Sequence, residues 1–176
     1  MPKIIEDVRL TILREARPML LQHGYDRLTL RGVAKASGIA VSTIYNYFES
    51  KDALVYGIFD ADWQPMLLKL AAFTNNVCSP IEGLRMAVAS VRELIIVYGS
   101  AWIEYRNIYR SSPFLIQQHE KIISDLNSVI HPMMLRFRPE YLPVFSYFLS
   151  QTILALAAEA NTQFDTFLPI FEKLCE

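Results

Sequence analysis

The stretch "SGIAVSTIYNYFESKDAL", residues 37–54, decides the fold that the sequence predicts. Its first three residues read as a tight turn around a glycine, and residues 41–47 read as a short helix. Another short helix, "LRGVAKAS" at residues 30–37, comes before the turn, with Thr29 as its N-cap. Two short helices joined in this way predict a helix-turn-helix over about residues 29–48, whose second helix enters the major groove of DNA.

The second helix has a core face and a polar face. Ile44 and Phe48 are four residues apart, so they share one face and are expected to point into the core. Lys51 begins the next helix, where positive charge and free backbone N–H groups favour a phosphate. The other positions carry hydroxyl, amide and phenol groups, which suit a phosphate backbone better than hydrolytic chemistry: Ser42, Thr43, Tyr45, Asn46 and Tyr47. Packing is the alternative role for the two tyrosines, but the core face is already filled.

The longer stretch "ILREARPMLLQHGYDRLTLRGVAKASGIAVSTIYNYFESKDAL", residues 12–54, resembles the DNA-binding domain of the TetR family of bacterial transcription regulators. The shared features are an alanine in the first helix (Ala16), the pair Gly24-Tyr25, the threonine before the second helix, the "SGI" turn and "TIYNYFESKDAL". Two positions depart from the family pattern. Ala40 stands where the family usually has serine, and Pro18 is uncommon in the first helix.

The resemblance implies two sets of DNA contacts. The phosphate contacts would come from Thr29, Thr43, Tyr45, Tyr47 and Lys51, and the base contacts from Val41, Ser42 and Asn46. The side-chain chemistry agrees, because asparagine can bridge N6 and N7 of adenine and valine can touch a thymine methyl group. Since residues 41–47 contain no arginine to bind guanine, we expect half-sites rich in A·T pairs.

The composition indicates a helical protein with a substantial core. Hydrophobic residues make up 52% of 176 residues, and apolar positions recur at spacings of three and four. The net charge of −1 is uneven: residues 1–55 hold 8 Lys and Arg against 6 Asp and Glu, and the remainder holds 9 against 12. We therefore predict an all-α chain of about nine helices. A helix-turn-helix domain at 1–58 precedes an effector-binding and dimerisation domain at 59–176, and the fourth helix continues to about residue 73.

Several features limit the classes of protein that fit. Cys78 and Cys175 lie far apart without metal-ligand neighbours, so we expect no zinc site, no disulfide and no cofactor, and a reducing cytoplasm. The start "MPKIIEDVRL" is too charged for a secretory signal. The uncharged run at 141–158 approaches the length of a membrane span, but Pro143 and Gln151 favour a buried or interface helix.

Aromatic residues in the second half suggest an apolar effector pocket. Tyr98, Trp102, Tyr105 and Tyr109 follow spacings of four, three and four, unless Gly99 interrupts the helix. Core packing is the alternative, and the pocket wall is favoured by the inducer binding that the resemblance implies. The further lining candidates are Met86, Phe114, His131, Met134 and Phe137. Arg92 or His131 could supply a polar anchor, or could equally be surface or core residues, and the apolar lining predicts a hydrophobic or aromatic effector.

The last two helices are the predicted dimer surface. A helix that is apolar all round must be buried, and the resemblance implies that the last two helices pair with their copies in a four-helix bundle. The candidates are Ser146, Ser150, Ile153, Ala157, Phe164, Phe167 and Phe171. A dimer also follows from DNA geometry, because a two-fold pair of helix-turn-helix domains reads a palindrome.

These observations lead to a homodimeric, nucleoid-associated repressor that binds a palindromic operator and is released by a hydrophobic or aromatic small molecule. The alternative is a DNA-binding protein of the same fold that recruits a protein partner without a small-molecule effector. An enzyme is disfavoured, because the sequence contains no H-E-x-x-H, no G-x-S-x-G and no glycine-rich phosphate loop.

Overall fold

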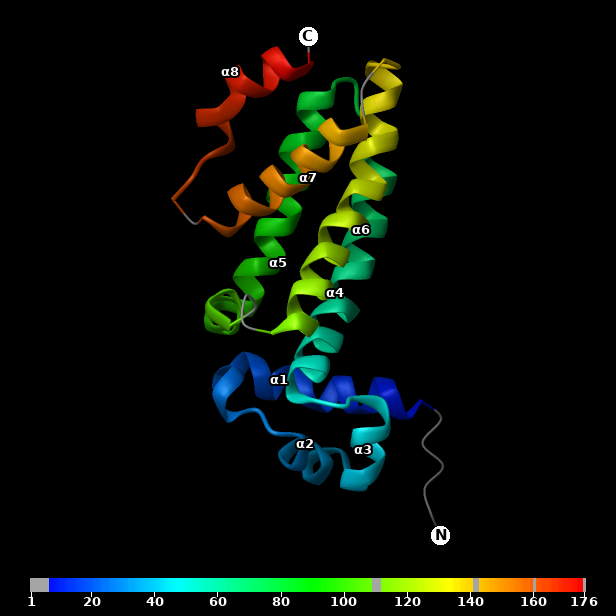
Figure 1. The fold of residues 1–176 in the computed structure, drawn as a ribbon, viewed down its shortest axis with the longest axis vertical. Helices are drawn as coiled ribbons and strands as arrows, with labels where there is room; N and C mark the ends of the chain where they lie inside the picture. The colour runs from blue at the N-terminus through cyan, green and yellow to red at the C-terminus, as the bar shows by residue number, and fades with distance from the viewer. Residues whose placement is uncertain (1–6, 109–111, 141–142, 160, 176) are drawn as a thin grey trace. The chain divides into compact units, whose positions relative to one another are not determined.

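A computed structural model describes residues 7–108, 112–140, 143–159 and 161–175. Within these ranges the chain is helical and without strands, and it forms eight helices (Figure 1). They are α1 (Val8–Arg27), α2 (Leu30–Ser37), α3 (Val41–Tyr47), α4 (Lys51–Thr74), α5 (Pro80–Ile108), α6 (Pro113–Phe137), α7 (Pro143–Ala158) and α8 (Phe164–Cys175). The predicted all-α class is confirmed.

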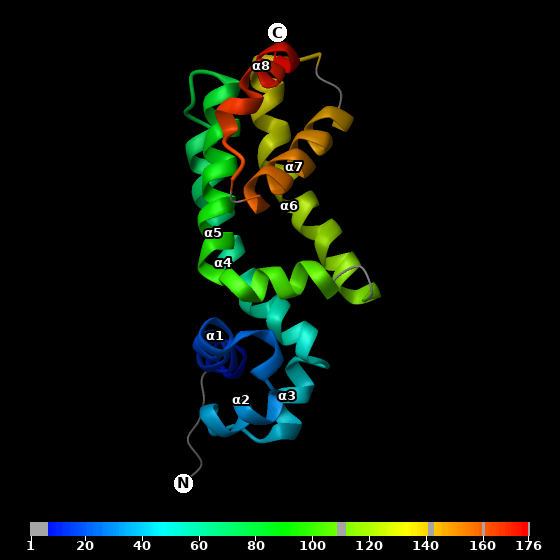
Figure 2. The ribbon, with the colours of Figure 1, turned by 90° about the vertical axis from the view of Figure 1, so that its left-hand side faces the viewer.

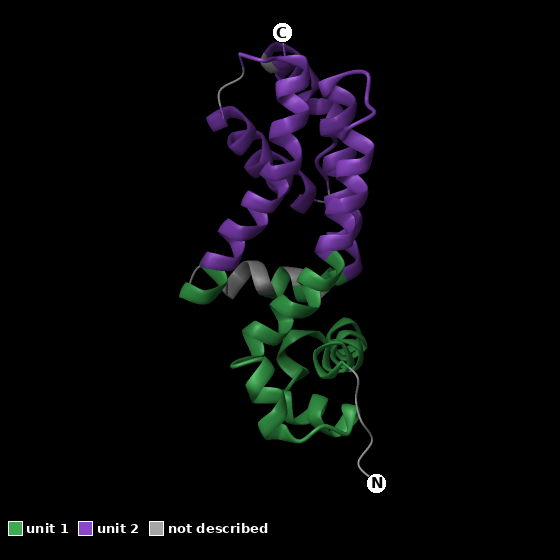
Figure 3. Cartoon of the chain, turned by 90° about the vertical axis from the view of Figure 1, so that its right-hand side faces the viewer, with its two compact units in different colours: residues 1–62, 98–116 green, residues 63–97, 117–176 purple. Residues whose placement is uncertain are grey.

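The chain divides into two compact units that interleave along the sequence (Figure 3). Unit 1 contains residues 1–62 and 98–116, and unit 2 contains residues 63–97 and 117–176. The helices α4, α5 and α6 therefore each contribute residues to both units. In unit 1 the helix-turn-helix segment is joined by residues 98–116, which are far from it in the sequence.

Unit 1 gathers α1, α2 and α3 around a small apolar core. Ile12, Ala16, Val33 and Ile44 are fully buried or nearly so, and Phe48 is 3% exposed. The carboxylate of Asp7 accepts from the N–H of Leu10 across 2.9 Å and so caps the start of α1.

Two glycines interrupt helices that otherwise continue. Gly24 has φ 76° and ψ 176° within α1, and helical residues resume after it up to Arg27. Gly99 has φ 45° and ψ −116° and kinks α5. The kink leaves α5 as one interrupted helix, and counting its two parts separately would give the predicted total of about nine helices.

Unit 2 is held together by close helix contacts and by two arginines. A Cβ on Gly83 of α5 would lie 2.0 Å from Sδ of Met133 of α6, so these two helices approach closely (Figure 2). Arg92 donates to the carbonyl oxygens of Leu156 and Thr162 across 2.6 and 2.5 Å, which fixes the end of α7. Arg136 of α6 donates to the carbonyls of Asn75 and Val77, beyond the end of α4.

None of the described helices, α7 included, has the length and apolarity needed to cross a membrane.

Candidate nucleic-acid interface

The turn between α2 and α3 is built from local hydrogen bonds. Gly38 adopts the left-handed conformation with φ 68°, the usual end of a helix that closes on glycine. The N–H of Ile39 then donates to the carbonyl of Ala34 across 3.2 Å, and the hydroxyl of Ser37 donates to the carbonyl of Val33 across 2.7 Å. These bonds fix the direction in which α3 leaves the turn.

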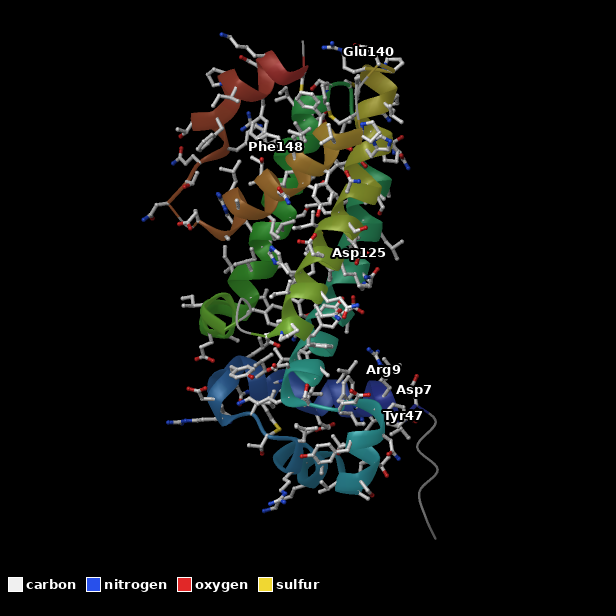
Figure 4. The ribbon with its side chains drawn as sticks, viewed as in Figure 1. Asp7, Arg9, Tyr47, Asp125, Glu140 and Phe148 are labelled. Atoms are coloured by element: carbon white, nitrogen blue, oxygen red, sulfur yellow. The ribbon has the colours of Figure 1, made fainter. Side chains whose placement is uncertain are left out.

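The two faces of α3 differ as the sequence predicts. Ile44 is fully buried and Phe48, just after the helix, is 3% exposed. The other face is open to solvent: Val41, Tyr45 and Tyr47 are 37%, 48% and 47% exposed. Ser42 and Asn46 are also exposed, and Thr43 is half-buried. Tyr47 is the last residue of α3 (Figure 4).

Thr29 precedes α2 and Ala40 precedes α3, but only Thr29 caps its helix with a side chain. The Oγ1 atom of Thr29 accepts from the N–H of Gly32 across 3.0 Å and caps α2 as predicted, while the side chain remains exposed. Because the hydroxyl accepts in this cap, its proton is free to be donated to a phosphate. Ala40 makes no side-chain cap to α3, as expected where the family usually has serine.

Lys51 is held by the residues that follow the break in α1. Its Nζ lies 3.9 Å from the centroid of the Tyr25 ring and donates to the carbonyl of Asp26 across 3.2 Å. The hydroxyl of Tyr25 donates to the carboxylate of Asp52. Burial, followed by the hydrogen bond to Asp52, raises the pKa of Tyr25 above its ordinary value, so this phenol stays protonated and remains a donor. The pair Gly24-Tyr25 is the only sequence signal for this arrangement.

The residues predicted to line an effector pocket are divided between the two units. Tyr98 and Phe114 belong to unit 1, where Tyr98 is 5% exposed and Phe114 meets the Tyr56 ring edge-on at 6.2 Å. Four candidates belong to unit 2: Met86, His131, Met134 and Phe137. The side chains of Trp102 and Tyr105, and the whole of Tyr109, lie outside the described part of the chain.

Tyr98 has a polar anchor within unit 1. Its hydroxyl donates to Oδ2 of Asp62 across 2.9 Å and to the carbonyl of Ile58 across 3.1 Å. Burial, and next the negative charge of Asp62, raise the pKa of Tyr98 well above its ordinary value. In unit 2, Nδ1 of His131 lies 3.0 Å from Oγ of Ser146, and Met134 is fully buried. Tyr98, His131 and Met134 thus take part in the packing of their own units.

An open groove of about 560 Å³ lies in unit 1, lined by residues of α1 and α4. Its walls include Leu10, Leu13 and Ile58, together with Arg14 and Arg17. None of the predicted effector-lining residues contributes to this groove.

The dimer candidates mostly face the core of their own protomer. Ser146, Ser150 and Ile153 are fully buried and hydrogen-bonded or packed within the protomer, and Ala157, Phe164 and Phe171 are at most 7% exposed. Phe167 is half-buried. Side chains with no exposed surface cannot meet a partner unless the protomer rearranges. The same two helices expose a different apolar set: Val144, Phe145, Phe148 (Figure 4) and Ile170.

The first part of the chain is similar in sequence to known proteins. Residues 12–57 match the sequence model of the family described as bacterial regulatory proteins, tetR family. A 70-residue stretch is 36% identical to the HTH-type transcriptional repressor Rv1474c of Mycobacterium tuberculosis, covering 38% of this chain and 37% of that protein. The chain covers less than half the length of the curated relatives that it matches.

Solved structures share the fold over nearly the whole chain. GusR of Salmonella enterica superimposes with a TM-score of 0.66 at 18% identity, covering 99% of this chain and 97% of that chain. The regulator FadR of Bacillus subtilis, in complex with stearoyl-CoA, gives a TM-score of 0.64 at 16% identity, covering 93% of this chain and 89% of that one. At these identities the likeness concerns the fold.

Proposed function

Through residues 12–57 the chain belongs to the TetR family of bacterial regulatory proteins, and we propose that it is a homodimeric repressor of transcription. It binds a palindromic operator with α3 in the major groove and leaves it when a hydrophobic or aromatic small molecule binds the rest of the chain. The proposal keeps the predicted division into a DNA-binding domain at 1–58 and an effector and dimerisation domain at 59–176. A DNA-binding protein of this kind acts in the cytoplasm, at the nucleoid.

The observation that carries the proposal is the exposed face of α3. A short helix usually buries its apolar residues and leaves charged residues outside, but α3 presents a valine, a serine, an asparagine and two tyrosines to solvent. Val41, Ser42 and Asn46 supply the methyl, hydroxyl and amide groups that read base edges. Tyr45, Tyr47, Thr43 and Thr29 supply hydroxyl donors for the phosphates that flank the groove.

The exposed apolar side of α7 supports a dimer. Val144 and Phe148 are 67% and 52% exposed and lie four residues apart, so they share one face of α7. Two-fold pairing of this face would remove apolar surface from water, and a two-fold dimer suits a palindromic operator. We therefore assign the interface to the exposed face formed by Val144, Phe145 and Phe148, with Ile170 of α8. Phe167, which is half-buried, stays a candidate from the set predicted from the sequence.

A hydrophobic effector is supported by the apolar character of unit 2 and by the acyl-CoA bound to the structurally similar FadR. Met86, His131 and Phe137 are half-buried in unit 2, so a ligand could reach them with modest rearrangement. Release requires that the effector bind the DNA-incompetent state more tightly than the competent one. Repression rather than activation of transcription is supported by the name of the Mycobacterium tuberculosis relative, a transcriptional repressor.

The experiment that tests the proposal is selection from random duplex DNA at near-physiological salt, where non-specific binding is suppressed. An enriched palindrome is the expected result, and it provides the probe for an effector screen. In that screen, hydrophobic compounds are added to the labelled duplex and its release is followed by fluorescence anisotropy. Release by none of them, together with capture of a protein partner on the same duplex, would favour the alternative that recruits a protein.

A further inference from the structure

A glutamate of α5 holds the backbone at the break in α1. The N–H of Tyr25 donates to Oε2 of Glu104 across 2.7 Å, and both residues belong to unit 1. A Cβ on Gly24 would lie 3.3 Å from Oε1 of the same carboxylate, and the backbone there has φ 76°. A glycine at position 24 therefore gives both the turn and the room for the carboxylate.

The side chain of Tyr25 extends the effect of this hydrogen bond to the start of α4. Its hydroxyl donates to Asp52, and its ring lies 3.9 Å from Nζ of Lys51. The next carbonyl, of Asp26, accepts from the same ammonium group. Glu104 therefore fixes the backbone of Tyr25. The side chain of Tyr25 and the carbonyl of Asp26 in turn hold Lys51 and Asp52, the first two residues of α4.

A lysine side chain has four rotatable bonds, and ordering it on DNA costs free energy that a preset position reduces. The ring of Tyr25 and the carbonyl of Asp26 use only part of the ammonium, because Nζ has three N–H groups. The remaining donors of Lys51 stay available at the N-terminus of α4, where free backbone N–H groups also favour a phosphate.

We propose that Glu104 is a positioning residue for DNA binding, which acts through Tyr25 to place the ammonium of Lys51 for its phosphate contact. This inference rests on the proposed function and deepens it, because it gives a residue distant in sequence a defined role at the DNA surface. Glu104 itself touches no DNA in this account. Its carboxylate only needs to accept a hydrogen bond, so an amide oxygen at the same position should serve nearly as well.

The test compares Glu104→Ala, Glu104→Gln, Lys51→Ala and the double variant Glu104→Ala/Lys51→Ala, each as the full chain. The probe is a labelled duplex of fixed mixed sequence, titrated at several salt concentrations, so that the phosphates dominate the binding. We expect Glu104→Ala to weaken binding about fivefold, the scale of one cation–π interaction. The slope of log K against log salt should fall in magnitude by about 0.9 for each phosphate that the variant no longer neutralises.

Two comparisons separate positioning from a general loss of structure. In the Lys51→Ala background, Glu104→Ala should have almost no further effect, because the ammonium that it positions is gone. Glu104→Gln should bind like the parent, and so should Glu93→Ala, which removes an exposed glutamate from the same helix. Equal losses with and without Lys51, or an unchanged salt slope, would overturn the inference. A parent that bound no duplex even at low salt would contradict the proposed function as well.

Discussion

The hydroxyl of Tyr98 and the Nε of Arg17 donate to the same oxygen, Oδ2 of Asp62, across 2.9 and 2.8 Å. Tyr98 is the residue before the kink of α5 at Gly99. This shared carboxylate therefore joins α1, α4 and α5 within unit 1. The contact holds Tyr98, the first residue of the segment 98–116, against α1 and α4 within unit 1.

Removing the Tyr98 hydroxyl should destabilise the protein. In Tyr98→Phe, the carboxylate of Asp62 and the carbonyl of Ile58 lose a donor, and we expect a loss of about 1–2 kcal/mol in the free energy of unfolding. Urea unfolding at one fixed protomer concentration measures it. Tyr147→Phe is the matched control, since its hydroxyl donates to Glu120 at the surface, and it should change stability by less than about 0.5 kcal/mol. Equal losses in both variants would contradict this role of Tyr98.

Stability should fall at alkaline pH, in a way that depends on Tyr98. Burial raises the pKa of Tyr98, and also that of Tyr25, above the ordinary value of 10.0. Above about pH 10 the unfolded chain therefore binds fewer protons than the folded one, so the free energy of unfolding decreases as pH rises. Urea unfolding between about pH 9 and about pH 11 measures the slope. Tyr98→Phe should have a shallower slope, and identical slopes would count against a buried, protonated phenol.

The exposed face of α7 should control dimerisation. We expect Phe148→Glu to raise the dimer dissociation constant by at least about tenfold, because a charge would be buried in an apolar interface. Sedimentation equilibrium gives the constant directly. Leu68→Glu is the matched control: Leu68 is 72% exposed on α4, outside the assigned interface, and its variant should dimerise like the parent. A Phe148→Glu variant with unchanged dimerisation would place the interface elsewhere.

The tyrosines of α3 should contribute affinity without sequence preference. Tyr47→Phe removes one phenol donor, and we expect about fivefold weaker binding on every duplex, since phosphate contacts carry no base information. Anisotropy titrations on the enriched duplex and on a scrambled duplex measure the two losses. A loss confined to the enriched duplex would instead assign Tyr47 to a base edge.

Local signals in the sequence predicted the helix-turn-helix closely. The bounds of α2 and α3, the cap by Thr29 and the turn at Gly38 all agree with the prediction. Each depends on residues at most four positions apart, so the sequence carries the full information. The buried state of Ile44 and Phe48 followed from the same short-range pattern.

Long-range contacts could not be predicted in this way. The bond from Glu104 to Tyr25 joins residues 79 positions apart, and the bond from Tyr98 to Asp62 joins residues 36 apart. The sequence of α7 is apolar on most sides, so its period does not reveal which side faces the protomer core. The small residues at positions 146, 150 and 157, which the sequence predicts at the dimer surface, are buried within the protomer.

Parallel selections with the parent and with Asn46→Ala test most directly whether α3 reads the operator. Random duplex DNA, near-physiological salt and equal protein concentrations are used for both. The account predicts that the parent enriches a palindrome with A·T-rich half-sites and that Asn46→Ala loses the preference at one position in each half-site. No enrichment by the parent, or the same preference at every position with both proteins, would contradict it.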